Sequence, residues 1–221
     1  MRTVVVSKQK GGCGATTLAR ELGVAAAASG QKVVFIDLDP QGTLRKWWNR
    51  RTETLEGDPN PALATPEPTG LAGALEELRA AKMDLCIIDT PPSIHAFLKG
   101  VVRVADLVLL PTRCTTDDLD ALPDVLEQVE EAGRRFAFVL TQVPPGKSTL
   151  YDDTVQMLAQ RGRVAPPLRF RAAFPVAAAT GRTATEYAPR DKATAEVQDL
   201  WTFVANDLSK LARQRARALA S

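Results

Sequence analysis

Cysteine is scarce in this sequence. The three cysteines, Cys13, Cys86 and Cys114, lie far apart, and no two of them have the spacing of a metal site. We therefore expect neither a disulfide framework nor a cysteine-ligated metal, and the free thiols indicate a reduced, cytoplasmic protein. The single histidine, His95, is expected at the surface or at the start of a helix.

Long apolar runs and a strong net charge are also absent. No segment approaches the roughly 20 apolar residues that span a bilayer, and the apolar run at 3–6 is too short for a signal peptide. A net charge of +2 excludes a protein that binds nucleic acid over its whole surface, although it permits a local basic patch. The 221 residues are enough for one large α/β domain, and we expect residues 1–221 to form a single domain with a C-terminal helix.

Short, continuous apolar runs alternate with helical stretches along the chain. Such runs are typical of parallel strands that are covered on both faces. Strands are expected at residues 3–7, 32–36, 85–88, 107–110 and 136–140, and helices at 16–28, 71–80, 117–132, 149–160 and 192–220. This order predicts a doubly wound α/β fold with a mainly parallel sheet and helices on both faces. The segment 57–70 holds four prolines and is expected to be a surface loop.

A glycine-rich segment follows the first expected strand and opens the first expected helix. Its residues are Lys10, Gly11, Gly12, Cys13, Gly14, Ala15, Thr16 and Thr17. In this setting the glycines let backbone N–H groups wrap around an anion, and the helix N-terminus adds a partial positive charge. Thr16 is placed to offer its hydroxyl to Mg²⁺. The segment predicts a phosphate-binding loop.

Two acidic segments follow the second and third expected strands. The first runs Asp37-Leu38-Asp39-Pro40-Gln41-Gly42, and the second runs Ile87-Ile88-Asp89-Thr90-Pro91-Pro92-Ser93. Ligands bind at the carboxyl edge of such sheets, where both segments are expected to lie. Asp89 ends an apolar strand, as in a Walker B motif, and its carboxylate would hold Mg²⁺ through water.

Together the three segments resemble the ParA/MinD family of deviant Walker A ATPases, in particular the small plasmid-partition ParA proteins. An ordinary phosphate loop, G-x-x-x-x-G-K-[ST], would need glycine at position 9 and lysine at position 15. The deviant pattern of the family, K-G-G-x-G-K-[ST]-[ST], is matched everywhere except at Ala15. The family's D-x-D-P-Q-G and D-x-P-P stretches are matched as well. The resemblance implies a deviant P-loop NTPase that binds ATP or ADP with Mg²⁺.

The resemblance also implies roles for individual residues. Lys10 would reach across a nucleotide-sandwich homodimer to the partner's phosphates, and Asp39 would position the attacking water. Phe170 and Arg171 belong to the late segment in which the family closes over the nucleotide base. The implied catalytic residues are Lys10 and Asp39; the nucleotide-binding residues are Gly11, Gly12, Cys13, Gly14, Ala15, Thr16, Thr17, Phe170 and Arg171; the metal-binding residues are Thr16, Asp37 and Asp89.

Members of the family hold nucleoid DNA as ATP-bound dimers and segregate plasmids or position other cargo with a ParB-like, centromere-binding adaptor. The resemblance therefore implies nonspecific DNA binding and a cytoplasmic, nucleoid-associated protein. Clustered lysine and arginine suffice for contacts with DNA phosphates, although cations near the end of a helix also fit a merely solvated helix terminus. A membrane-binding helix is not expected, because no bulky apolar stripe accompanies the basic residues. The candidate DNA-binding residues are Arg171, Arg182, Arg190, Lys210, Arg213, Arg215 and Arg217.

Ala15 is the one departure with chemical consequences. A lysine at this position would place a cation on the β- and γ-phosphates, and alanine removes it. Hydrolysis is therefore expected to be weak or absent, since phosphoryl transfer depends on charge stabilisation at the transferring group. Either a lysine was replaced here deliberately, or a natural protein has lost it. The alternative function is a nucleotide-binding scaffold or regulator without hydrolysis. Trp47 and Trp48 are expected to pack in the core or at an interface.

Overall fold

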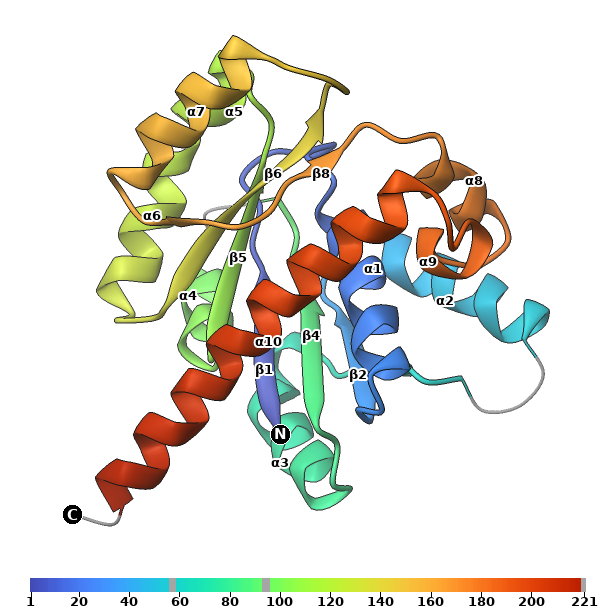
Figure 1. Ribbon diagram of the computed structural model, residues 1–221. Helices are drawn as coiled ribbons and strands as arrows, with labels where there is room; N and C mark the ends of the chain where they lie inside the picture. The colour runs from blue at the N-terminus through green and yellow to red at the C-terminus, as the bar shows by residue number, and fades with distance from the viewer. Residues whose placement is uncertain (56–58, 93–95, 220–221) are drawn as a thin grey trace.

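A parallel sheet forms the centre of the computed structural model, which describes residues 1–55, 59–92 and 96–219 and, within them, all side chains except those of 68, 96–97 and 215–219. The strands lie in the order β3-β2-β4-β1-β5-β6-β7. The short strand β8 stands outside this order and pairs with the later part of β6 (Figure 1). The pairings along this order are parallel, with Val6 opposite Asp89 and Asp37 opposite Asp89. The strands are β1 (Arg2–Val6), β2 (Val33–Asp37), β3 (Ala62–Ala64), β4 (Leu85–Asp89), β5 (Leu107–Thr112), β6 (Phe136–Val143), β7 (Arg163–Val164) and β8 (Leu168–Arg169).

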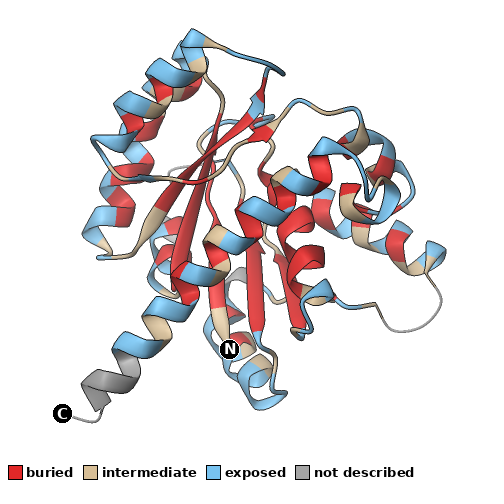
Figure 2. Ribbon diagram, viewed as in Figure 1, coloured by how far each residue is buried: buried red, intermediate tan, exposed pale blue. Residues whose placement is uncertain are grey.

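Helices cover both faces of the sheet because successive strand residues point to opposite faces. Val4 and Val6 pack into one core with α1, α2, α8, α9 and α10, whereas Val5 packs into a second core with α3, α4, α6 and α7. The central strands are buried along their length (Figure 2). The helices are α1 (Ala15–Ala28), α2 (Thr43–Thr54), α3 (Leu71–Ala80), α4 (Ala96–Arg103), α5 (Thr116–Asp120), α6 (Leu122–Glu131), α7 (Thr149–Ala159), α8 (Ala173–Ala179), α9 (Ala184–Tyr187) and α10 (Lys192–Leu219), with a 3₁₀ turn at Pro68–Gly70.

Close packing between α1 and β2 sets the distance between the helix and the sheet. A Cβ at Gly23 would lie 2.3 Å from the Phe35 ring, so only glycine lets α1 approach this closely. Trp47, on α2, is fully buried with its ring edge-on to Phe35, and its indole N–H donates to the Arg182 carbonyl. The expectation that Trp47 packs in the core is confirmed.

The predicted fold class is confirmed, but two predicted segments are wrong in detail. The proline-rich segment 57–70 is not loop throughout, because Ala62–Ala64 form a strand that pairs with β2. The helix predicted over 117–132 is divided into α5 and α6 at Ala121. Pro123 lies in the first turn of α6, where its missing N–H costs nothing, and it cannot continue a helix that begins earlier.

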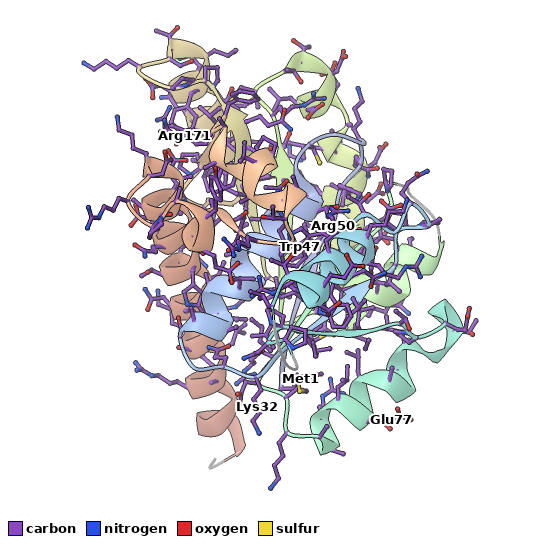
Figure 3. The ribbon with its side chains drawn as sticks, turned by 90° about the vertical axis from the view of Figure 1, so that its right-hand side faces the viewer. Met1, Lys32, Trp47, Arg50, Glu77 and Arg171 are labelled. Atoms are coloured by element: carbon purple, nitrogen blue, oxygen red, sulfur yellow. The ribbon has the colours of Figure 1, made fainter. Side chains whose placement is uncertain are left out.

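The starts of β1 and β2 lie at one end of the sheet, and the loops that follow the strands lie at the other. Met1 and Lys32, which precede β1 and β2, lie at one end of the molecule, while Arg171 lies near the other (Figure 3). The loops that follow β1, β2 and β4 therefore gather at the carboxyl edge. Within the described ranges, no helix combines enough length and apolarity to cross a membrane.

Candidate functional site

The loop between β1 and α1 is held in place by β6. The Thr141 hydroxyl donates to the Cys13 carbonyl at 2.6 Å, and the Gln142 side-chain amide donates to the Gly12 carbonyl at 2.6 Å. Gly14 has a φ of 81° and precedes α1 without a side-chain cap. The first N–H groups of α1 are thus left to a ligand or water, as in anion sites at helix N-termini.

A cavity of about 390 Å³ lies over this loop, and we call it the phosphate cavity. Residues from all three sequence motifs line it, which places the motifs at one site as the sequence predicts. It is lined by Lys8, Gly11, Gly12, Gly14, Ala15, Thr16, Thr17, Asp39, Gln41, Thr43, Pro92 and Gln142.

Asp89 lies fully buried at the end of β4 and accepts a hydrogen bond of 2.6 Å from the Thr16 hydroxyl. Burial raises the pKa of Asp89 to about 6, although the nearby Lys8 ammonium opposes this rise. The hydroxyl and the carboxylate are the oxygen ligands, or partners of water ligands, that Mg²⁺ takes beside phosphates. The structure thus brings Thr16 and Asp89 together beside the phosphate loop.

Asp37, which the sequence predicts to lie near the metal, accepts hydrogen bonds from two backbone N–H groups. One carboxylate oxygen accepts the N–H of Asp39 at 3.1 Å, and the other accepts the N–H of Arg45 at 2.9 Å. Asp37 thus orders the turn between β2 and α2, and it is not among the residues that line the phosphate cavity. Among the described residues, no group of three His, Cys, Asp or Glu could hold a metal ion. A magnesium ion here would depend on Thr16, Asp89, phosphate oxygens and water.

Lys8 lines the phosphate cavity, and sequence reasoning did not single it out. It is 6% exposed, and its ammonium lies 2.9 Å from Asp39 Oδ2 and 3.4 Å from Asp89 Oδ1. Burial lowers the pKa of Lys8, but attraction to Asp89 and Asp39 outweighs burial, so the pKa is raised and the ammonium stays charged. The signal in the sequence is a lysine just before a loop that lacks its usual cation at Ala15.

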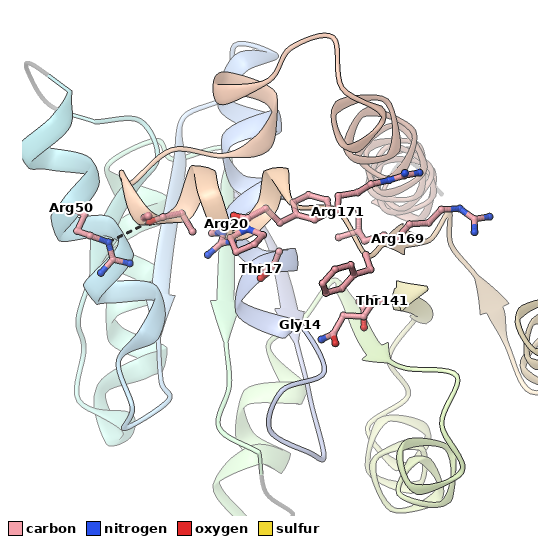
Figure 4. Close-up of a pocket in the computed structure, with 14 residues that line it drawn as sticks. Gly14, Thr17, Arg20, Arg50, Thr141, Arg169 and Arg171 are labelled. Carbon is pink, nitrogen blue, oxygen red and sulfur yellow. Dashed lines mark hydrogen bonds between the residues drawn. The ribbon is translucent and has the colours of Figure 1, made fainter. Parts of the chain in front are cut away.

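A second cavity, of about 580 Å³, adjoins the phosphate cavity and shares Gly14, Thr17 and Gln142 with it (Figure 4). We call it the base cavity. Phe170 and Phe174 give it apolar walls, so its chemistry suits a flat, aromatic group. Its lining is Gly14, Thr17, Arg20, Arg50, Thr141, Gln142, Leu168, Arg169, Phe170, Arg171, Phe174, Pro175, Ala178 and Ala179.

The predicted base-closing residues both line this cavity, but they differ in what they offer. Phe170 is 65% exposed, so its ring is available to a ligand. The Arg171 guanidinium donates to Glu196 at 2.6 Å, and it points away from Gly14 and Thr17 (Figure 4). Arg171 is therefore paired within the chain, while it also lines the base cavity.

Lys10 lies outside the phosphate cavity of its own chain. Its side chain is 43% exposed, and its ammonium is 3.9 Å from Asp117. The predicted catalytic pair is thus separated, because Asp39 lines the cavity and Lys10 does not.

The predicted DNA-binding residues whose side chains the structure describes come from separate elements. Arg182 and Arg190 are exposed beside α9, while Lys210 and Arg213 are exposed toward the C-terminal end of α10. Lys210 instead borders a groove of about 470 Å³, which we call the basic groove. Sequence reasoning missed this groove because its arginines come from separate elements. The side chains of Arg215 and Arg217 lie outside the described residues, as does His95. The basic groove is lined by Arg134, Arg135, Phe136, Arg161, Gly162, Arg163, Asp207 and Lys210.

Comparison with known proteins agrees with this geometry. The maintenance of carboxysome distribution protein A of Gloeobacter kilaueensis is 34% identical over 163 residues, which cover 73% of this chain and 72% of that protein. The chromosome-partitioning ATPase Soj of Thermus thermophilus is 32% identical over 155 residues, which cover 59% of this chain and 62% of that protein. A putative plasmid partition protein from Borrelia burgdorferi B31, solved bound to AMPPNP, superposes with a TM-score of 0.71 at 16% identity, covering 93% of this chain and 98% of that one.

The chain also matches a family of nucleotide-binding domains. The model of the CobQ/CobB/MinD/ParA nucleotide binding domain matches residues 4–184, which include the phosphate loop, Asp39 and Asp89. The resemblance to ParA and MinD proteins found in the sequence is thus confirmed. The chain belongs to the CobQ/CobB/MinD/ParA family of nucleotide-binding domains.

Proposed function

We propose that this chain is a partition or positioning ATPase that dimerises around ATP, binds DNA without sequence preference and segregates a plasmid or other cargo with an adaptor. The observation that carries the proposal is the convergence of the phosphate loop, Asp39 and Thr16 on one cavity, with Asp89 bonded to Thr16. The base cavity continues from it and supplies the apolar walls that a nucleotide base needs. Residues 1–221 would act as a single nucleotide-binding domain.

Within this proposal, ATP or ADP lies with its phosphates on the loop and its base against Phe170. Gly11, Gly12, Cys13, Gly14 and Thr17 present backbone groups to the phosphates. Thr16 and Asp89 hold Mg²⁺, which supplies the charge neutralisation that phosphoryl transfer needs. Asp39 orders the attacking water, and Asp37 supports it by fixing the turn in which Asp39 lies.

Ala15 limits the reaction, because it places a buried methyl group where a cation would contact the transferring phosphate. We expect the chain to release phosphate from ATP at least about 10²-fold more slowly than an Ala15→Lys variant, the loss typical of one electrostatic contact at a transition state. Phosphate release is measured for both in the presence of Mg²⁺ and duplex DNA. Ala15→Met, which adds length without charge, is the matched control and should remain slow.

Ala15 also favours the second candidate function, a nucleotide-binding scaffold that does not hydrolyse ATP. The two candidates separate in the same assay. A rise in turnover for Ala15→Lys but not for Ala15→Met supports an ATPase that lacks one contact. If the chain binds nucleotide but neither variant releases phosphate faster than the unchanged chain, the result supports the scaffold and contradicts the ATPase.

The DNA-binding part of the proposal centres on the basic groove and the adjoining end of α10. Arg161, Lys210 and Arg213 are exposed there, and clustered cations of this kind contact DNA phosphates independently of sequence. A homodimer would double the number of such contacts. We further propose that a ParB-like adaptor stimulates the ATPase and that the protein works in the cytoplasm on the nucleoid; the partitioning functions of the named relatives support this.

A further inference from the structure

The phosphate cavity lacks a cation at one position and has one at another. Ala15 lies where the family pattern has a lysine, and Lys8 lies seven positions earlier in the chain, immediately before the loop. Both residues line the same cavity, and both are buried. The ammonium of Lys8 could therefore contact a bound ligand, or it could only stabilise the folded chain.

The charges around the cavity favour a contact between Lys8 and a negatively charged ligand. Lys8 is the one basic side chain among the described residues that line the cavity. A nucleotide with two or three phosphates brings several negative charges into a space that already holds the Asp39 carboxylate and, close by, that of Asp89. Without a cation in the cavity, that much negative charge would oppose binding.

The position of the ammonium fits a phosphate contact. Lys8 follows β1 by two residues and reaches into the cavity, where its ammonium lies between Asp39 and Asp89 at 2.9 and 3.4 Å. An ammonium has three N–H donors, so these two partners leave one donor over. Mg²⁺ at Thr16 and Asp89 would neutralise Asp89 and leave Lys8 a further donor for a phosphate oxygen.

We propose that Lys8 is the phosphate-binding lysine of this chain and takes the place of the cation that is missing at Ala15. The proposal rests on the proposed function, because it presumes that the cavity binds a nucleotide. Lys8 contacts the outer phosphates, and its pairing with Asp39 and Asp89 fixes the ammonium in the cavity before the ligand enters. The contribution of Lys8 to binding affinity therefore increases with the number of phosphates in the nucleotide.

The test compares four proteins by calorimetric titration with AMP, ADP and AMPPNP in the presence of Mg²⁺. They are the unchanged chain, Lys8→Met, the exchange variant Lys8→Ser/Ala15→Lys, and Lys99→Met. The last is the matched control, because Lys99 also pairs with a carboxylate, Glu131 at 3.0 Å, but lies outside the site. Thermal melts establish that each variant is folded.

Lys8→Met should bind AMPPNP about 30-fold or more weakly, since losing one partner of a buried charge pair lowers affinity by at least that factor. The loss should be smaller for ADP and smallest for AMP. The exchange variant should recover AMPPNP affinity, and Lys99→Met should match the unchanged chain.

Three results would overturn the role of Lys8 while leaving the nucleotide site intact. They are an unchanged AMPPNP affinity in Lys8→Met, an equal loss for AMP, ADP and AMPPNP, and a folded exchange variant that stays weak. If Lys8→Met does not fold, the exchange variant alone decides the question. Failure of the unchanged chain to bind any of the three nucleotides would overturn the proposed function, and this inference with it.

Discussion

At the scale of single residues, α1 buries a charged pair, Arg20 and Glu21, at the edge of the base cavity, which Arg20 helps to line. Glu21 is 1% exposed and accepts the N–H of Ala184 at 3.0 Å, while Arg20 lies 3.7 Å away and donates to the Phe174 carbonyl. Burial raises the pKa of Glu21 to about 7, although Arg20 and the Ala184 N–H oppose the rise. The pair links α1 to the segments around α8 and α9, which carry part of the base cavity.

This pKa makes stability depend on pH in a defined direction. The folded chain holds the Glu21 proton more tightly than the unfolded chain, whose pKa is near 4.5. The stabilisation is therefore complete below about pH 4.5 and is lost as the pH rises through about 7. Relative to Glu21→Gln, the free energy of unfolding should fall over this window by up to about 3 kcal/mol, because one pKa unit corresponds to about 1.4 kcal/mol.

Denaturant titrations across this pH range provide the measurement. Glu77→Gln is the matched control, because Glu77 is exposed on α3 (Figure 3) and its replacement should leave the pH dependence unchanged. A difference between Glu21→Gln and the unchanged chain that is constant with pH would show that Glu21 stays ionised throughout.

Residues that belong to a motif were predictable from the sequence, whereas those defined by a spatial neighbour were not. The positions of Thr16, Asp39 and Asp89 follow from where each strand ends, since parallel strands bring their carboxyl ends to one edge. Lys8 belongs to no motif, and only its distances to Asp39 and Asp89 reveal it. The pairing of Arg171 with Glu196 was equally hidden, because the two residues are 25 positions apart.

At the scale of elements, the two parts of α10 differ in their surroundings. Its first part packs Val197, Leu200 and Val204 into the core beside α1. Its later part carries Lys210 to the basic groove and Arg213 one turn beyond it, far along the helix from Arg182 and Arg190, since a helix advances about 1.5 Å per residue. The groove and the α9 region are therefore two separate candidates for DNA contact.

Replacing Arg161, Lys210 and Arg213 together with alanine should weaken DNA binding for all sequences alike and reduce its salt dependence. Each phosphate contact releases counterions, and the AMPPNP-bound dimer presents these three side chains twice, so losing six contacts should lower the magnitude of the slope of log K against log salt by about 5. Binding of a fluorescent duplex is measured at several salt concentrations with AMPPNP, in the Ala15→Lys background.

The matched control removes three exposed cations elsewhere, at Arg182, Arg190 and Lys192. This variant should keep the parent's slope. If the two variants exchange these behaviours, DNA lies against the α9 region and not against the basic groove.

The elements were predictable where the sequence shows a clear apolar pattern. The five central strands were predicted within three residues at each end, because an apolar run long enough to cross a core has few alternatives. Two- and three-residue strands such as β7, β8 and β3 carry no such pattern and depend on pairing with their neighbours. α4, α8 and α9 were missed because they are short, and α2 was missed although it has 12 residues, because most of its side chains are polar or charged and show no clear apolar period.

At the scale of the whole molecule, we expect Lys10 to take part in the contact between two copies. It is exposed and outside its own phosphate cavity, so its charge is available to a second chain. In the Ala15→Lys background, Lys10→Ala should abolish or strongly weaken the dimer formed with AMPPNP, which sedimentation velocity measures. Asp117→Asn removes the carboxylate beside Lys10 and should preserve the dimer. A dimer of equal strength with and without Lys10 would contradict the role of Lys10 across the interface.

Because the thiols are buried to different extents, their alkylation can report which part of the structure opens in solution. Cys13 lies in the phosphate loop at 2% exposure, Cys86 lies in β4 at 0%, and Cys114 is half-buried. Burial raises the pKa of all three, that of Cys86 to about 12, so reaction with an alkylating reagent requires opening of the surrounding structure. Peptide mapping after timed alkylation should show Cys114 modified first and Cys86 last, only on global unfolding. Cys13 then reports opening of the phosphate loop alone, and AMPPNP should slow its modification without changing that of Cys114.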